Sequence, residues 1–298
     1  MDIKLVNHRT LIGYAAGITT GITYGFNPLF GVPLMNNGAS IESILFFRYL
    51  FAVLFLGAYM LLRGQSFKIS WKQAGILLFL GVLYMFSSIF LFEAYNYIAS
   101  GLATTLIFLY PVIVALIMVF LKVYPSWQVW LSIFITFAGV VIMTQGDSAH
   151  AINPIGVLLS LGSASVYALF IVIINRSKAI GAISNSLLTF YALMVGATIF
   201  FLRVFYSGAE LTTGIEGCAG WFNIFGLALL PTVVSTATLA ISTRNIGATK
   251  ASVLGVFEPI TAILIGTLVF GEVLSTNIVI GIILSVAAVV FMIVSTKK

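Results

Sequence analysis

Charged side chains are scarce in this chain. Of its 298 residues, 7% are charged and 61% are hydrophobic, whereas a soluble domain carries about 25% charged residues. So few polar side chains cannot cover the surface of a globule in water. The composition therefore excludes a soluble fold and predicts a protein that lies in a lipid bilayer.

Residue types that carry common chemistry are also sparse. A single cysteine, Cys218, excludes an internal disulfide. The two histidines, His8 and His150, lie outside the apolar runs, and no cluster of His, Cys and carboxylates has the spacing of metal ligands. The phosphate-binding pattern GxxxxGK followed by Ser or Thr is absent, so nothing supports direct use of ATP. We expect a protein that is not an enzyme and that uses no cofactor and no metal.

Long apolar runs are abundant instead. Runs of about 20 residues, the length that crosses a hydrocarbon core, occur near 11–31, 41–62, 73–94, 99–121, 126–145, 154–175, 185–206, 220–243, 250–271 and 274–294. They are continuously apolar and do not alternate, which excludes the strands of a membrane barrel. We predict an all-α integral membrane protein with ten transmembrane helices.

The basic residues are distributed unevenly around these spans. With the N-terminus in the cytoplasm, twelve of the fourteen fall on the cytoplasmic side: Lys4, Arg9, Arg63, Lys68, Lys72, Lys122, Arg176, Lys178, Arg244, Lys250, Lys297 and Lys298. Arg203 falls at an outer helix end and Arg48 within a span. We predict a multi-pass protein of the plasma (inner) membrane with both termini cytoplasmic. Its net charge of +6 then needs no nucleic-acid partner to explain it.

The two halves of the chain are similar to each other. Residue pairs separated by 143 positions match in identity, namely Gly13 with Gly156, Tyr24 with Tyr167 and Phe47 with Phe190. The run 103–106 ahead of Pro111 recurs 148 positions later as 251–254 ahead of Pro259. We predict two five-helix repeats, 1–147 and 148–298. Because five is odd, the second repeat must be inverted relative to the first, a layout typical of transporters.

Two ionisable residues, Arg48 and Glu258, lie deep within predicted spans. There each charge needs a partner, a carbonyl group or a wet cavity, which makes both residues functional candidates. The alternative for Arg48 is a structural charge bonded to carbonyls or paired with a carboxylate, for which Glu93 is one candidate. Glu258 directly precedes Pro259, which removes a backbone hydrogen bond. Glu258 could therefore titrate, bind a cationic substrate or cap freed backbone groups.

Other polar side chains recur along the spans. Thr20, Tyr24 and Asn27 share one helix face, which should be turned toward protein or water because lipid would leave their hydrogen bonds unmade. We predict that such residues line a central cavity that binds substrate, and ordinary packing between helices is the alternative. With the two charged residues above, the candidates are Thr20, Tyr24, Asn27, Arg48, Tyr84, Tyr110, Ser163, Tyr167, Tyr191, Ser235 and Glu258.

Glycines form a stripe in the first span, at Gly13, Gly17, Gly21 and Gly25. Small residues at every fourth position lie on one helix face and let two backbones approach closely, which favours tight helix packing. The alternative is a smooth face that slides during transport.

The chain resembles the EamA family of the drug/metabolite transporter superfamily. The resemblance lies in Phe47–Arg48, Glu258–Pro259 and Phe270–Glu272 with Leu274–Ser275 after it, together with the five-plus-five layout. It implies a ten-helix inverted-repeat carrier with a central cavity, commonly an exporter of amino acids, amines or other small metabolites. The first half departs from the family pattern at 122–126, which lacks the Gly-Glu pair.

We therefore predict a secondary transporter that exports a small metabolite such as an amino acid or amine by alternating access. Its partners are a small-molecule substrate, the lipid bilayer and, through Glu258, protons. A zwitterion would suit one arginine and one glutamate, since opposite charges could meet its two ends. The alternatives are a scaffold without transport, an intramembrane enzyme and a narrow channel, for which no ring of like charges marks a filter.

Overall fold

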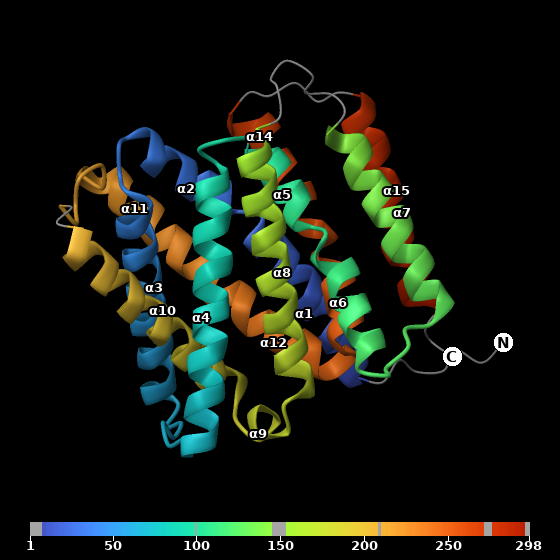
Figure 1. The fold of residues 1–298 in the computed structure, drawn as a ribbon, viewed down its shortest axis with the longest axis horizontal. Helices are drawn as coiled ribbons and strands as arrows, with labels where there is room; N and C mark the ends of the chain where they lie inside the picture. Colours follow the sequence, from blue (N-terminus) through green and yellow to red (C-terminus); the bar gives the residue numbers. More distant parts are fainter. Residues whose placement is uncertain (1–7, 99, 145–152, 208–209, 271–275, 296–298) are drawn as a thin grey trace.

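In a computed structural model the chain forms a bundle of helices (Figure 1). The structure describes residues 8–98, 100–144, 153–207, 210–270 and 276–295. Within these residues every regular element is a helix. Six helical segments are long and apolar enough to cross a membrane, namely Ile41–Leu62, Trp71–Ala94, Pro154–Arg176, Asn185–Tyr206, Gly217–Ile246 and Ala248–Val269. The prediction of an all-helical, multi-pass membrane protein is therefore confirmed.

Four of these segments contain the long helices α3 (Ile41–Leu62), α4 (Trp71–Ala94), α8 (Pro154–Arg176) and α10 (Asn185–Ser207). The other two are composite. One contains α11 (Gly217–Ala228), the π-helix η1 (Leu229–Val234) and α12 (Ser235–Ile246). The next contains α13 (Ala248–Val253), the 3-10 turn η2 (Leu254–Val256) and α14 (Phe257–Val269).

The remaining predicted spans are occupied by helices that are interrupted or shorter. Range 11–31 is divided between α1 (His8–Tyr24) and α2 (Asn27–Asn36), and range 99–121 between α5 (Ser100–Ile107) and α6 (Tyr110–Phe120). Ranges 126–145 and 274–294 hold α7 (Trp127–Thr144) and α15 (Thr276–Ser295), and a short α9 (Lys178–Gly181) follows α8. The count of ten spans stays a prediction, as does the division into repeats at 147.

Proline lies at each interruption of a helix. Pro28 follows the break between α1 and α2, Pro111 follows the break between α5 and α6, and Pro259 follows η2. Pro231 lies inside η1. Because proline has no N–H, it removes one hydrogen bond from the helix and permits a break or a change of pitch.

Helices from the two halves of the chain pack in related pairs. α1 packs along α12, and α4 packs along α8. By the sequence correspondence α8 is the counterpart of α1, and α4 is the counterpart of α12. Each pair therefore joins one helix of the first half to one helix of the second half, and the internal repeat relates the two pairs. The contacts correspond in detail, because Gly13 lies against Ile246 while Gly156 lies against Ile98, the residue 148 positions before Ile246. α3 pairs with α10 and α7 with α15, and the latter pair lies at one side of the bundle (Figure 1).

The glycine stripe of α1 faces α12, η2 and α14, which belong to the two composite segments. A Cβ atom at Gly13 would lie 2.6 Å from Ile246, one at Gly21 would lie 2.8 Å from Phe257, and one at Gly25 would lie 2.6 Å from the carbonyl of Glu258. Contacts this close leave no space for a side chain on α1. The prediction that the stripe serves tight helix packing is confirmed.

The bundle has a basic end and an acidic end. The basic end contains the connections α3–α4, α6–α7, α8–α10 and α12–α13, with Arg9, Arg63, Lys68, Lys72, Lys122, Arg176, Lys178, Arg244 and Lys250. The acidic end contains the connections α2–α3, α4–α5 and α10–α11, with Glu42, Glu93, Glu210 and Glu216. Lys4, Lys297 and Lys298, assigned above to the cytoplasmic side, lie outside the described residues.

Candidate functional site

Two tyrosines from equivalent positions of the two halves meet inside the bundle. The rings of Tyr24 in α1 and Tyr167 in α8 stack with centroids 5.7 Å apart and planes 20° apart. Tyr110 of α6 meets the ring of Tyr167 edge-on at 5.0 Å, and Phe170 stacks on Tyr167 at 6.2 Å. We call Tyr24, Tyr110, Tyr167, Phe170 and Tyr84 the central aromatic group.

Tyr84 extends this group toward α12 and α3. Its ring lies 5.3 Å from Phe170, and its hydroxyl accepts a hydrogen bond from Thr236 at 3.1 Å. Tyr49 of α3 meets it edge-on at 5.8 Å and shares a 2.7 Å hydrogen bond with Ser88. Sequence reasoning did not select Tyr49 or Phe170. Phe170 occupies the position equivalent to Asn27 in the first half, and this equivalence is the one sequence signal that could have selected Phe170.

Thr20 and Ser163, also at equivalent positions, make equivalent contacts. The Ser163 hydroxyl donates to the Ser87 carbonyl at 2.7 Å, and the Thr20 hydroxyl lies 3.4 Å from the Ser235 carbonyl. Thr20 also shares a 2.8 Å hydrogen bond with the hydroxyl of Thr238. These bonds join α8 to α4 and α1 to α12. At Thr20 and Ser163 these bonds support the alternative interpretation, in which the polar residues serve ordinary packing between helices.

Asn27 lies at the break between α1 and α2. Its Nδ2 donates to the Tyr24 carbonyl at 2.9 Å, which satisfies one acceptor that the break leaves without its helical partner. Its Oδ1 is buried, with no partner within the described residues. Asn27 thus fixes the geometry of the break directly beside the stacked tyrosines.

Arg48 is fully buried, and its side chain is bonded to η1. Its Nε donates to the Thr232 hydroxyl at 2.5 Å, and its Nη2 donates to the Pro231 carbonyl at 3.3 Å. The guanidinium carbon lies 5.7 Å from the ring centroid of Phe92, a distance at which cation–π attraction operates. Within the described residues Nη1 has no hydrogen-bond partner and no carboxylate is paired with Arg48. Its predicted alternative partner, Glu93, instead accepts a hydrogen bond from Asn96 at 3.3 Å.

The π-turn η1 presents unusual acceptors to Arg48. The Thr232 hydroxyl donates to the Leu227 carbonyl five residues back, at 2.8 Å, and the Ser235 hydroxyl donates to the Pro231 carbonyl at 2.6 Å. Single π-turns inside α-helices occur frequently at functional sites. Sequence reasoning missed this element, although Pro231 in the middle of a predicted span was a signal for it.

Glu258 lies in the first turn of α14 and is 2% exposed. Its Oε1 has no hydrogen-bond partner within the described residues. Its backbone packs against the end of α1, because a Cβ atom at Gly21 would lie 3.2 Å from the Glu258 nitrogen and one at Gly25 would lie 2.6 Å from its carbonyl oxygen. Glu258 therefore lies beside Tyr24 and the central aromatic group, and among the described residues no ion pair joins it to Arg48.

Gly255, one turn before Glu258, lies directly against the hydroxyl of Tyr110. A Cβ atom at this position would overlap the hydroxyl oxygen, so only glycine allows the approach. Tyr110 is the counterpart of Glu258 in the first half of the chain, 148 positions earlier. The two equivalent positions are thus brought to the same region of the bundle, one with a phenol and the other with a carboxyl group.

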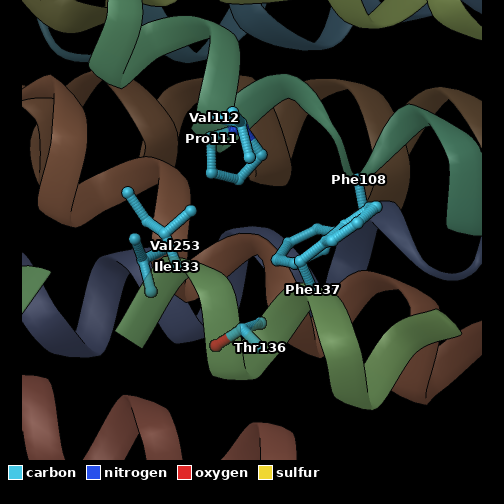
Figure 2. A pocket seen from close by; sticks show the side chains of 7 residues that line it. All are labelled: Phe108, Pro111, Val112, Ile133, Thr136, Phe137 and Val253. Carbon is cyan, nitrogen blue, oxygen red and sulfur yellow. The ribbon is translucent and has the colours of Figure 1, made fainter. Parts of the chain in front are cut away.

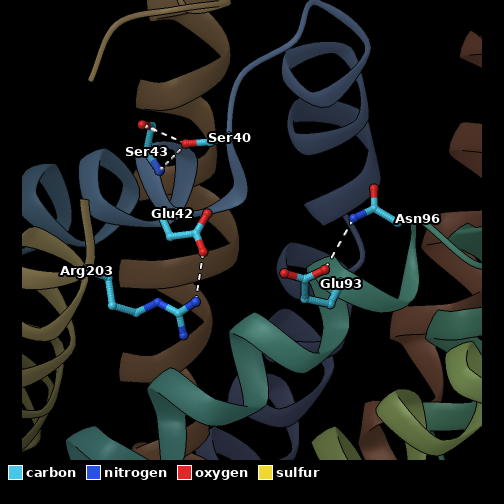
Figure 3. A network of polar contacts seen from close by, with 6 residues as sticks. All are labelled: Ser40, Glu42, Ser43, Glu93, Asn96 and Arg203. Carbon is cyan, nitrogen blue, oxygen red and sulfur yellow. Dashed lines mark hydrogen bonds and ion pairs between the residues drawn. The ribbon is translucent and has the colours of Figure 1, made fainter. Parts of the chain in front are cut away.

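A polar hollow opens at the acidic end of the bundle, and Figure 3 shows four of the side chains that line it, Ser40, Glu42, Glu93 and Asn96. It has a volume of about 300 Å³ and is lined by Met35, Ala39, Ser40, Ile41, Glu42, Glu93 and Asn96. Glu42 forms an ion pair with Arg203 of α10, with 2.8 Å between Oε1 and Nη2. This pair joins α3 to α10 at the rim.

We expect replacement of Arg203 by glutamine to change stability little. The Arg203 side chain is 48% exposed and the Glu42 side chain 24% exposed, so solvent screens the pair and its loss should cost less than about 1 kcal/mol of unfolding free energy. Thermal unfolding in detergent at low and high salt would measure this. A large destabilisation that salt does not reduce would contradict the expectation.

Comparison with known proteins identifies the family. The model of the EamA-like transporter family matches the chain twice, over residues 11–145 and 154–294. The chain belongs to the EamA-like transporter family. It is 25% identical over 297 residues to the uncharacterized transporter YdfC of Bacillus subtilis (strain 168), and the match covers 99% of this chain and 92% of YdfC. We conclude that the chain is a membrane transporter of the drug/metabolite type.

The fold of this EamA-like chain is also found in a solved structure. A protein of known crystal structure superposes with a TM-score of 0.77, covering 95% of this chain and 97% of the other. The sequence identity is 18%, so this likeness concerns the fold alone.

The EamA-like motifs fall at distinct places in the bundle. Phe47–Arg48 brings the arginine to η1, and Glu258–Pro259 begins α14. The Gly-Glu pair, with Glu272, lies outside the described residues. At the departure in the first half, α6 ends at Phe120, and Lys122, two residues later, has a φ of 60°, the left-handed conformation that favours glycine.

Tyr191, the counterpart of Arg48 in this EamA-like chain, does not join the central aromatic group. Its hydroxyl donates to the Phe67 carbonyl in the α3–α4 connection at 2.7 Å. Side chains on a helix lean toward its N-terminus, and α10 begins at the basic end, so Tyr191 is directed toward that end. Arg48, on a helix that begins at the acidic end, leans the opposite way.

A second pocket is apolar and narrow (Figure 2). It lies between α6, α7 and α13 and is lined by Phe108, Pro111, Val112, Ile133, Thr136, Phe137 and Val253. It has no space for a water molecule. None of the predicted site residues lines it, so we assign it to helix packing beside the break at Pro111.

Proposed function

We propose that this EamA-like protein is a secondary carrier that exports a small metabolite such as an amino acid or amine by alternating access between two inverted repeats, 1–147 and 148–298. The stacking of Tyr24 on Tyr167 carries the proposal. Two equivalent residues of a duplicated chain can touch only where the pseudo-symmetry axis passes. In inverted-repeat carriers, the substrate site lies at the interface between the repeats, near the bilayer midplane.

The reciprocal packing of helices supports this arrangement. Each half contributes one member to the pairs α1–α12 and α4–α8, so neither half packs as an independent unit. Movement of one half against the other would change the contacts on both sides of the central aromatic group together, as alternating access requires.

The residues around the axis suit a polar organic substrate. The tyrosine rings offer stacking surfaces and hydroxyls, while Arg48 and Glu258 supply one charge of each sign. Glu258 is the group that we propose to carry the coupled proton, because its carboxyl group is buried and one oxygen is unbonded within the described residues. Buried carboxyl groups in membrane carriers commonly relay protons.

The charges at the two ends of the bundle support one orientation in the membrane. The basic end should lie in the cytoplasm, because positively charged connections are retained there. We propose that the protein lies in the plasma membrane with both termini cytoplasmic, and that substrate leaves through the hollow at the acidic end.

Counterflow in liposomes tests this function. Purified protein would be screened against pooled labelled amino acids and amines, and we expect saturable exchange of at least one compound. Tyr24→Ala and Tyr167→Ala should each slow exchange by at least about 10-fold, a loss equivalent to about 1.4 kcal/mol. Tyr206→Ala, which removes a ring that is 83% exposed, is the matched control. If no compound exchanges faster than in empty liposomes, the carrier proposal is wrong.

A further inference from the structure

The positive charge of Arg48 has no counterion in the described part of the chain. Two of its nitrogens donate to neutral acceptors, the Thr232 hydroxyl and the Pro231 carbonyl. The third, Nη1, is buried and finds no acceptor among the residues that the structure describes. Burial of an unpaired cation is costly, and a hydrophobic residue of similar size would commonly pack at less cost. Simple helix packing therefore does not account for an arginine here.

The guanidinium is nevertheless held in one orientation. Thr232 and Pro231 hold it from η1, while the rings of Phe92 and Tyr49 lie 5.7 and 5.9 Å from its central carbon. An arginine fixed in this way presents its remaining N–H groups in a planar fork, which matches the geometry of a carboxylate. A preorganised donor loses little entropy when it binds such a group.

The hollow at the acidic end lies above Arg48 along α3. Ile41, which lines the hollow, precedes Arg48 by seven residues and so lies on the same helix face, about 10 Å nearer the acidic end. Phe92, whose ring contacts the guanidinium, directly precedes Glu93, another residue of the lining. Neighbouring residues of α4 therefore line the hollow and contact the guanidinium.

We propose that Arg48 and the π-turn η1 form a subsite for the carboxylate group of the transported molecule. This inference rests on the proposed carrier function and narrows its substrate class to compounds that bear a carboxylate, such as amino acids, and excludes simple amines. Because the guanidinium is fully buried in this conformation, binding requires the packing around its Nη1 side to open. The carboxylate then accepts from the remaining N–H groups, while Thr232 and Pro231 of η1 keep the guanidinium oriented.

A comparison of matched compounds with the wild-type protein in liposomes tests the subsite. Each set would contain an amino acid, its amide, the corresponding decarboxylated amine and the corresponding deaminated acid, with small, branched and aromatic side chains represented. Inhibition of counterflow should be at least about 10-fold stronger for an amino acid than for its amide or amine, as expected for a charge-assisted hydrogen bond. Amides and amines that inhibit as strongly as amino acids would overturn the subsite and leave the carrier function intact. Absence of any counterflow would overturn both.

Variants of Arg48 test whether this residue is the source of the preference for amino acids over amides. Arg48→Gln should reduce the ratio of amino-acid to amide affinity to about 1, while Arg48→Lys should retain part of it because the charge remains. Arg63→Gln, at an exposed arginine of the basic end, is the matched control and should keep the full ratio. A folded Arg48→Gln protein with unchanged selectivity would overturn the proposal. If Arg48→Gln does not fold, the comparison of compounds with the wild-type protein still tests the proposal, because that comparison needs no variant.

Discussion

Replacement of Gly21 by leucine should leave little folded protein in detergent. A Cβ atom at Gly21 would lie 2.8 Å from the Cβ of Phe257, 3.0 Å from the Leu254 carbonyl oxygen and 3.2 Å from the Glu258 nitrogen. Two of these three atoms belong to the backbone, which cannot turn aside as a flexible side chain can. Leucine would therefore push α1 away from η2 and α14. Overpacking commonly costs about 1–3 kcal/mol, and we expect about 3 kcal/mol or more here because tight packing is what holds membrane helices together.

The same substitution at Gly75 provides the control. Gly75 lies in α4 on an exposed face, and a Cβ atom there would contact nothing within 4 Å. Gly75→Leu should therefore unfold at or above the wild-type temperature, because leucine is a better helix former than glycine. Thermal unfolding and size-exclusion profiles in detergent would compare the two variants. Equal unfolding midpoints for Gly21→Leu and Gly75→Leu would show that the α1 interface is not tightly packed.

Replacement of Glu258 by glutamine should abolish accumulation driven by a pH gradient. The amide matches the carboxyl group in size but cannot take up and release a proton. Because Glu258 is 2% exposed and flanks the central aromatic group, no solvent-exposed acid can substitute for it at the same place. Uptake of the counterflow substrate into liposomes with an imposed pH gradient should fall to the level seen without a gradient.

Counterflow itself separates coupling from folding in this variant. Exchange of substrate for substrate needs no net proton movement, so Glu258→Gln should retain it if the fold and the binding site are intact. Glu216→Gln, at an exposed carboxylate of the acidic end, should keep both activities. Undiminished gradient-driven uptake by Glu258→Gln would remove Glu258 as the proton carrier. Loss of both activities would instead assign it to binding or folding.

Several features of the bundle could be predicted from the chain because they depend on local composition. Long apolar runs predicted helices through the bilayer, and regular glycine spacing predicted a tight interface for α1. The interruptions at Pro28, Pro111 and Pro259 follow from the missing N–H of proline, a purely local cause. Pro231 differs from these prolines because it lies inside the π-turn η1. Only the packing of η1 against α3 shows that this turn places hydrogen-bond acceptors beside Arg48.

The partners of the embedded charges could not be predicted in the same way. Arg48 and Thr232 are 184 positions apart, and no local pattern relates them. Glu93 was as plausible a partner by charge, yet it lies at the rim and bonds to Asn96. Tyr191 illustrates the same limit, because its equivalence to Arg48 suggested a central place while the direction of α10 carries its side chain toward the basic end.

By itself, the sequence determined the medium, the helical class and the internal similarity of the two halves, because hydrophobicity and repetition are properties of the chain alone. Only the tertiary structure decided that equivalent residues meet, as Tyr24 and Tyr167 do, and that Arg48 lacks a counterion within the described residues. The reason is that a contact between distant residues depends on which helix faces approach each other. That choice depends on the packing of the whole bundle rather than on any single span.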